Sequence, residues 1–206
     1  MRGSKIVALA LCTLCLGLGG FAQDKGKAEG KQPSAMDAKQ KAAMEAWQKA
    51  STPGPEHATL AKMAGAWDVT IKSYDAPGEP NVSTGKAVRK MVLGGRFLQE
   101  EYKGTYMGQP FEGMGLTGYD NVLKKYTFFW ADSMGTSMMV GDGHMDAQGK
   151  VLTSVMTYTD PLTAKQAPMR QVMTKEGPDT ETFIMYGPGA DGKEKKMMEM
   201  TYKRAK

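Results

Sequence analysis

Few side chains in this sequence are suited to acid–base chemistry. Only two histidines occur, His57 and His144, and His144 lies in an alternating run with Asp142. An imidazole beside Asp132 or Glu101 would supply a general base, as in a cofactor-free isomerase or hydrolase. Two histidines this far apart, with no cysteine near either, do not make a convincing zinc site. A structural role for both histidines is the simpler interpretation, and we expect neither a metal nor a cofactor.

Methionine is the second residue type with possible chemistry, because the chain has 18 of them. They gather in two places, at Met134, Met138 and Met139 and at Met197, Met198 and Met200. Thioether sulfur is a good ligand for Cu(I), so copper handling through Met and His is one alternative function. Neighbouring methionines on a strand point to opposite faces, however, and one such pair cannot chelate a single ion. We therefore favour a packing role, in which methionine fills an irregular core or an adaptable pocket.

Aromatic side chains at alternate positions indicate a third kind of site, a ligand cavity. Tyr126, Phe128 and Trp130 share one face of a predicted strand, and Phe111 and Tyr119 share a face of the strand before it. If both faces point inward, they form an aromatic wall suited to a flat or apolar molecule. The same pattern also fits a barrel interior that is filled by side chains.

Three glycines bear on the choice between a cavity and a filled interior. Gly113, Gly115 and Gly118 remove side-chain volume from a single strand, which either bends that strand or clears space inside. We favour a cavity that holds a small apolar or amphiphilic ligand over catalysis or copper handling. The residues predicted to contribute to it are Phe111, Tyr119, Phe128, Trp130, Tyr102, His144 and Asp132.

Strands must position these residues, because the spacing of apolar residues changes to a period of two after Gly65. Trp67, Val69 and Ile71 alternate with polar residues, which is the pattern of a strand with one buried face. The pattern predicts ten strands, at about 66–74, 84–93, 96–104, 110–119, 124–132, 135–146, 150–159, 168–176, 180–187 and 194–204. Turn residues separate most of them.

Short strands at nearly even spacing are typical of an antiparallel up-and-down barrel. The predicted fold class is therefore all-β, with a barrel of eight to ten strands and a helix before it. A two-sheet sandwich is the nearest alternative, and the strand pattern separates the two poorly. In a barrel the first and last strands pair, so Arg204 would approach Trp67 and place its guanidinium over the indole. We expect that contact to close one barrel end as a structural element.

The N-terminal segment has the features of a secretory signal peptide, over residues 1–22. Arg2 and Lys5 precede an apolar stretch at 6–18, and small residues end at Ala22, the expected cleavage site. The apolar stretch is shorter than the ~20 residues of a membrane-spanning helix. We therefore expect an exported protein, periplasmic or secreted, without a membrane span. Cleavage would also remove both cysteines and with them any disulfide or thiolate chemistry.

Two further segments precede the barrel domain, which is predicted over 55–206. Residues 23–33 are rich in charged and polar side chains and are predicted to be a disordered leader. An amphipathic helix is expected over 34–52, with Met44 and Trp47 on its apolar face. That face would pack on the barrel or bind a partner.

The charge balance argues against nucleic acid as a partner. The formal net charge of +5 falls to +3 when Arg2 and Lys5 leave with the signal peptide, and the basic residues alternate with acidic ones. We expect a small molecule as the partner, and a protein that is a monomer or a weak dimer.

Short motifs are spread along the predicted barrel. They are His57-x-x-Leu60, Gly65-x-Trp67, Leu93-Gly94-Gly95-Arg96-Phe97-Leu98, Glu101-Tyr102-x-Gly104, Gly108-x-Pro110-Phe111-x-Gly113-x-Gly115, Gly118-Tyr119-Asp120-Asn121 and Trp130-x-Asp132-Ser133-Met134-Gly135-Thr136. With the basic residue that ends the last strand, they resemble the lipocalin superfamily and, more closely, a bacterial family of exported lipocalin-like barrels of unknown function. The resemblance covers about Pro55 to Arg204 and implies a barrel with a central cavity. It implies no established activity and no catalytic residues.

Overall fold

The computed structural model describes residues 37–206 apart from 75, 77, 190 and 191. The predicted signal peptide at 1–22 and leader at 23–33 therefore lie outside the described residues. Within the described part, two helices precede ten strands. Their bounds are α1 Ala38–Ser51, α2 Pro55–Ala61, β1 Gly65–Ser73, β2 Asn81–Val92, β3 Phe97–Tyr106, β4 Gln109–Asp120, β5 Lys125–Asp132, β6 Met139–Met145, β7 Val151–Thr159, β8 Gln166–Lys175, β9 Thr180–Pro188 and β10 Glu194–Arg204.

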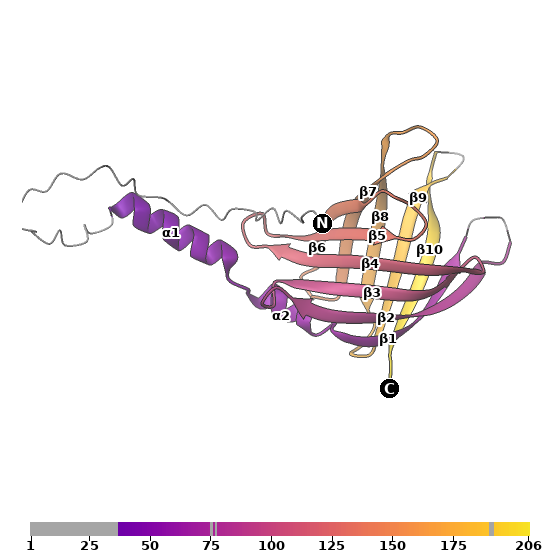
Figure 1. Ribbon diagram of the computed structural model, residues 1–206, viewed down its shortest axis with the longest axis horizontal. Helices are drawn as coiled ribbons and strands as arrows, with labels where there is room; N and C mark the ends of the chain where they lie inside the picture. Colours follow the sequence, from indigo (N-terminus) through magenta and orange to yellow (C-terminus); the bar gives the residue numbers. More distant parts are fainter. Residues whose placement is uncertain (1–36, 75, 77, 190–191) are drawn as a thin grey trace, which may run out of the picture. The chain divides into compact units, whose positions relative to one another are not determined.

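The strands β1–β10 close into one barrel (Figure 1), in which each strand pairs with the next one along the sequence. The ring is completed by β1 and β10, which pair antiparallel from Trp67 opposite Arg204 to Ser73 opposite Met198. This topology confirms the predicted all-β, lipocalin-like up-and-down barrel, at the upper end of the predicted range of strands, and excludes the sandwich. Closure is favourable because it leaves no strand edge unpaired.

The predicted strand limits lie within three residues of the observed ones everywhere except at the start of β6. That strand begins at Met139, four residues later than predicted. The intervening chain turns instead of pairing, because the Asp132 side chain accepts the backbone N–H of Met134 at 3.0 Å. Local side-chain bonding of this kind competes with strand pairing.

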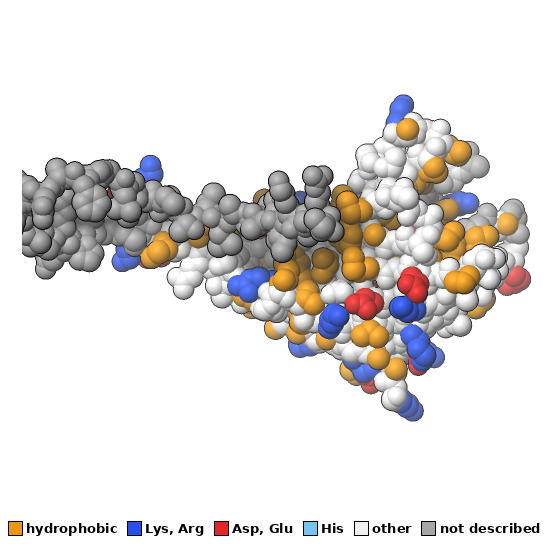
Figure 2. All heavy atoms as spheres, viewed as in Figure 1, with side chains coloured by type: hydrophobic (Ala, Val, Ile, Leu, Met, Phe, Trp, Pro, Cys, Tyr) orange, Lys and Arg blue, Asp and Glu red, His pale blue; other side chains and the backbone are white. Residues whose placement is uncertain are grey.

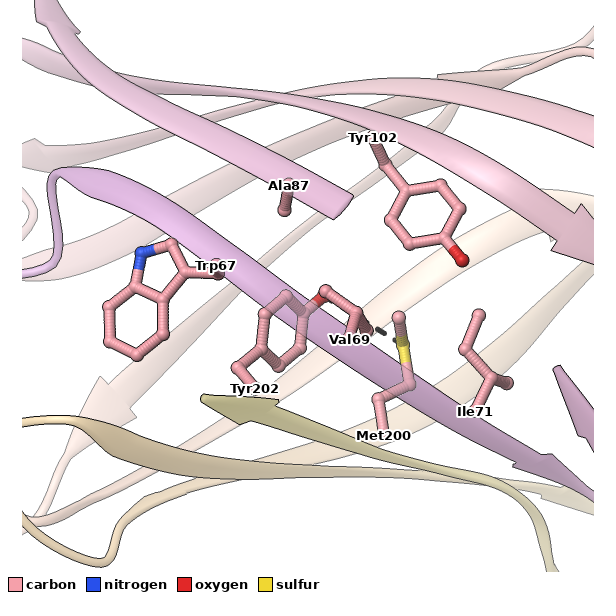
Figure 3. Close-up of a cluster of buried hydrophobic side chains, with 7 residues drawn as sticks. All are labelled: Trp67, Val69, Ile71, Ala87, Tyr102, Met200 and Tyr202. Atoms are coloured by element: carbon pink, nitrogen blue, oxygen red, sulfur yellow. Dashed lines mark hydrogen bonds between the residues drawn. The ribbon is translucent and has the colours of Figure 1, made fainter. Parts of the chain in front are cut away.

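The main core cluster lies inside the barrel around β1 (Figure 3). Every second residue of β1 is buried, as the period of two requires. The cluster draws on four adjacent strands and contains Trp67, Val69, Ile71, Ala87, Tyr102, Met200 and Tyr202. Figure 3 shows these side chains gathered around β1, with the Tyr202 hydroxyl bonded to the Met200 sulfur at 3.8 Å.

A second core cluster lies at one end of the barrel, where α2 covers it. Leu60 of α2 is fully buried and Met63 nearly so. They pack with Leu98, Tyr126 and Leu152, which lie near the starts of β3, β5 and β7. In an up-and-down barrel the starts of alternate strands meet at the same end, so α2 forms the floor of the barrel.

His57 has a structural role in this floor. Its Nδ1 accepts the backbone N–H of Gly54 at 3.0 Å, which holds the first turn of α2. The imidazole is buried and lies edge-on to the Tyr119 ring, with centroids 6.0 Å apart. The side chain therefore fixes the helix against the end of β4.

The outer face of the barrel carries charges of both signs close together (Figure 2). Several face each other across neighbouring strands, in the pairs Lys86–Asp68, Lys90–Glu101 and Lys103–Glu112. Exposed pairs of this kind contribute little stability, about 0–1 kcal/mol each.

The helix α1 is held at its C-terminal end by two barrel residues. Asn121 Nδ2 donates to the carbonyl oxygens of Ala50 and Thr52 at 3.1 and 2.8 Å, and Arg96 Nε donates to Ser51 at 3.1 Å. These donors satisfy carbonyl groups that a helix end leaves unpaired. No residue of α1 is buried, and Trp47 is 76% exposed. The structure therefore anchors α1 through its end rather than through the apolar face.

No helix among the described residues is long and apolar enough to cross a membrane.

Replacing Asn121 with alanine is expected to loosen the end of α1 while leaving the barrel intact. The lost hydrogen bonds are partly exposed, so we expect amide exchange in the last turn of α1 to accelerate roughly threefold, at the low end of ~0.5–1.5 kcal/mol per bond. Asn121→Asp should act at least as strongly, because a carboxylate donates no hydrogen bond. Asn81→Ala, at an exposed position of β2, is the matched control. Equal exchange rates in all three variants would contradict this role.

Candidate functional site

The barrel interior contains a cavity of about 370 Å³. Its apolar wall comes mainly from inward-facing strand residues, namely Ile71, Leu98, Phe111, Phe128, Trp130, Met139, Leu152, Met156, Met173, Phe183, Met185, Met198 and Met200. Leu60 and Met63 supply the floor. The polar groups on the wall are Arg89, Glu100, Tyr106, Thr117, Asp132, Ser154, Gln171 and Tyr202. Small-molecule sites typically measure about 300–1,000 Å³ and combine an apolar wall with a few polar groups, as here.

The end of the cavity opposite α2 reaches the surface. Met134, in the turn after β5, lines the cavity and is 61% exposed. The floor residues Leu60 and Met63 are at most 5% exposed. Access from solvent is therefore at the end formed by the β5–β6 turn.

The Trp130 indole is seated against two glycines of β4. A β-carbon at Gly113 would lie 2.7 Å from Trp130 Cη2, and one at Gly115 would lie 3.0 Å from Cε3. Trp130 Nε1 donates to Asp132 Oδ2 at 2.8 Å, which fixes the ring plane. These glycines therefore make room for the Trp130 ring against the wall. The third glycine, Gly118, makes room for Phe97 in the same way, with a β-carbon 2.7 Å from Cδ1.

The structure places the seven predicted cavity residues in three groups. Four of them, Phe111, Phe128, Trp130 and Asp132, line the cavity. Tyr102 does not line it: the ring is 1% exposed and packs against Phe111 with centroids 5.5 Å apart. Tyr119 and His144 line a separate depression of about 310 Å³ beside α2.

His144 lies outside the cavity because of its phase on β6. It shares the outer face with Val140 and Asp142, all three exposed, while Gly141 and Gly143 take the inner positions. Asp132, the predicted partner, lies at the far end of β5 and is bonded to Trp130 and Met134. The two groups therefore do not form an acid–base pair, and the predicted enzyme alternative has no histidine in the cavity.

At least eight methionines line the cavity, and Met198 and Met200 are among them. Met138, in contrast, is 61% exposed and lies in the β5–β6 turn. Among the described residues no group of three or more His, Cys, Asp and Glu side chains converges. Unbranched thioethers on a wall adapt to ligands of different shape.

A charged cluster that was not predicted from the sequence lies between the core and the cavity. Arg89 is bonded through Nε to Glu100 and through Nη1 to Glu181, each at 2.5 Å. Tyr202 donates its hydroxyl to Glu100 Oε1 at 3.2 Å. The guanidinium also lies over the rings of Tyr202 and Trp67, at 4.3 and 5.2 Å from their centroids. These contacts compensate for removing a cation from water.

The pKa values of the cluster follow from burial and charge. Burial opposes the charged form of Arg89, but Glu100, Tyr202 and Glu181 together raise its pKa above the ordinary value. Burial, reinforced by Glu100, raises the pKa of Tyr202 well above its usual range. The Tyr202 hydroxyl therefore stays protonated at neutral pH and acts as a donor to Glu100.

Strand phase is the sequence signal that identifies this cluster. Arg89 is in phase with the buried Ala87, and Glu181 is in phase with Phe183, so both charges occupy inward positions. A charged residue at an inward position of a barrel strand requires a partner. Which partner it has depends on register across strands, because Arg89 and Glu181 are 92 residues apart.

Arg204 closes the end of the barrel that α2 covers. Its guanidinium lies over the Trp67 ring, 4.3 Å from the centroid, and donates to the carbonyl oxygens of Ala64 and Lys62 at 2.8 and 3.0 Å. Trp67 Nε1 donates to the Met63 carbonyl at 3.0 Å. The indole thus joins the chain after α2 to β1 and β10.

Fold and cavity together define a lipocalin-like closed barrel with a small-molecule-sized interior. The chain belongs to the DUF1579 family, described as proteins of unknown function, whose sequence profile matches residues 52–204. The fold is similar to that of Rv2717c from M. tuberculosis, with a TM-score of 0.58 and 15% identity over 75% of this chain and 100% of that one. A redesigned β-barrel, mFAP0, bound to DFHBI, aligns at a TM-score of 0.41 and 17% identity over 69% of this chain and 99% of that one. No curated protein matches the chain significantly.

Proposed function

We propose that this protein binds a small apolar or amphiphilic molecule inside its barrel, after export from the cell. The observation that carries the proposal is the cavity of about 370 Å³, walled by aromatic and thioether side chains. Barrels of about eight strands either fill their interior with side chains or hold one small ligand, and the open volume in this wider barrel favours a ligand. The apolar wall favours burial of a hydrocarbon or aromatic body by about 25 cal/mol for each Å² removed from water.

The proposal is tested by filling the cavity from one strand position. Ser154 lines the cavity and its neighbour Val155 is exposed on the outer face, so Ser154→Phe and Val155→Phe introduce the same ring on opposite sides of β7. The neutral fluorophore N-phenyl-1-naphthylamine is the probe, titrated against the protein without its signal peptide. We expect Ser154→Phe to weaken binding about tenfold or more and Val155→Phe to leave it unchanged within about twofold. Absence of binding to the unmodified protein, or equal binding to both variants, would overturn the proposal.

A second measurement addresses the natural ligand and the export step together. Native mass spectrometry of the protein purified from its own host should show a retained small molecule, released on denaturing extraction. The mass of the same sample reports the processing site, and a chain that begins at Gln23 is expected from cleavage after Ala22. A chain that still begins at Met1 would contradict export through this signal peptide.

A further inference from the structure

The charges on the cavity wall are unbalanced. Among the described residues that line the cavity, the charged ones are Arg89, Glu100 and Asp132, one cation against two carboxylates. Arg89 is also bonded to Glu181, which is not among the residues that line the cavity. Counting Glu181 together with Lys175, which interacts with it electrostatically, leaves the same excess of one negative charge.

Arg89, the single cation among the described residues of the wall, is already paired with carboxylates. The Arg89 side chain is 4% exposed, and its guanidinium is bonded to two carboxylates and covered by the Tyr202 ring. An anionic ligand would therefore lie against Glu100 or Asp132 without an unpaired cation to receive it. Placing two like charges together in a site of low dielectric is costly.

Glu100 is the more exposed of the two carboxylates in the cluster, and it lines the cavity. Its side chain is 16% exposed, compared with 4% for both Arg89 and Glu181. Oε2 accepts from Arg89, while Oε1 accepts, among the described residues, only the Tyr202 hydroxyl, at the long distance of 3.2 Å. A carboxylate oxygen has two lone pairs, so Oε1 retains capacity for a further donor. It lies toward the floor of the cavity, with the apolar wall between it and the surface, because Arg89 and Glu100 pair near the α2 end of β2 and β3.

The rest of the wall suits a cation with an apolar body. Phe128, Trp130 and Phe183 line the cavity, and aromatic faces attract a positive charge that has left water. Thioethers alongside them are polarizable and tolerate chains of different shape. The combination of a partly free carboxylate with aromatic and thioether walls is suited to an alkyl or aryl ammonium group.

We infer that the ligand is an amphiphilic cation, an apolar molecule with a protonated amine that bonds to Glu100 at the cavity floor. This inference rests on the proposed function and adds the charge of the ligand to it. Three probes with the same ten-carbon chain distinguish the inferred ligand charge from apolar binding alone. They are decylamine, 1-decanol and decanoate, titrated by calorimetry at pH 7 and low salt. We expect decylamine to bind at least about tenfold more tightly than decanol, since a hydrogen bond between two charged groups is stronger than one from a neutral hydroxyl, and decanoate to bind most weakly.

Variants at neighbouring positions locate the effect. Glu100→Gln removes the charge inside, and Glu101→Gln removes the neighbouring charge on the outer face, where the side chain is 48% exposed. The Glu100 variant should lose most of the preference for decylamine over decanol, whereas the Glu101 variant should keep it. Preference in the unmodified protein is measured without any variant, so a poorly folded Glu100→Gln would still leave a decisive result.

The possible outcomes distinguish the inference from the proposed function. If decanol binds and decylamine binds no more tightly, or if decanoate binds best, the inference is overturned while an apolar binding site stands. Equal loss of preference in the Glu100 and Glu101 variants would also overturn it, because bulk surface charge would then be the cause. If none of the three probes binds, the inference fails together with its premise.

Discussion

Replacing Arg89 with methionine is expected to lower the free energy of unfolding by about 3–5 kcal/mol. The substitution keeps an apolar stem of similar length but leaves Glu100 and Glu181 without the cation that both of them bond. Uncompensated carboxylates in a barrel interior are costly because little water reaches them, and the nearby Lys175 interacts with Glu181 without replacing the bonds from Arg89. Urea denaturation at pH 7, followed by tryptophan fluorescence and circular dichroism, measures the change.

The control for this experiment is an ion pair on the outer face, between β2, which also carries Arg89, and β1. Lys86 and Asp68 pair at 2.7 Å with side chains 77% and 57% exposed, so Lys86→Met should change stability by less than about 1 kcal/mol. A combined variant with Arg89→Met, Glu100→Gln and Glu181→Gln should recover part of the loss, because it removes the stranded charges. Equal effects of Arg89→Met and Lys86→Met would show that the buried cluster does not stabilise the barrel in this way.

Replacing Trp67 with alanine is the second change with a large expected effect, a loss of about 3–5 kcal/mol. The indole is 1% exposed and packs at the point where β1 meets β10. Its removal leaves a cavity, takes a hydrogen bond from the Met63 carbonyl and uncovers the guanidinium of Arg204. Trp67→Phe should cost less, because the ring face over which Arg204 lies is kept.

Trp47 provides the matched control for this second prediction. It is the same residue type, lies on α1 and is 76% exposed, so Trp47→Ala should change stability by no more than about 0.5 kcal/mol. Thermal unfolding by calorimetry compares the two alanine variants directly. A barrel that tolerates Trp67→Ala as well as Trp47→Ala would contradict the role of the indole in closing the barrel end.

The strands and their order were predictable from sequence because the signals are local. Trp67, Val69 and Ile71 alternate with polar residues, and residues such as Gly94 and Gly95, both with positive φ, mark the reversals. The β5–β6 turn was placed wrongly because the bond from Asp132 to Met134 leaves no trace in the apolar pattern. The alternation also predicted part of the cavity wall correctly, since Phe111, Phe128 and Trp130 line the cavity.

Strand phase was harder to assign where a strand has little apolar contrast. On β6 the inner positions include Gly141 and Gly143, and the outer ones include Val140 and His144. Glycine has no side chain, so the alternation of Gly141 and Gly143 with Val140 and His144 does not by itself indicate which side faces the barrel interior. The glycines are required there by close contact with β7, because a β-carbon at either would meet main-chain atoms of that strand. Such a contact exists only once the two strands are paired.

By itself, the sequence determined the all-β class, the approximate positions of the strands and much of the aromatic wall, since periodicity and turn chemistry act over a few residues. The tertiary structure alone decided which charges meet inside. Arg89 reaches Glu100 through the register of the neighbouring strands β2 and β3. It reaches Glu181 past β1 and β10, from 92 residues further along the chain. Register and closure are collective results of all ten pairings, and no local pattern encodes them. The electrostatic character of the cavity, and with it the expected charge of its ligand, therefore arises from the closed barrel.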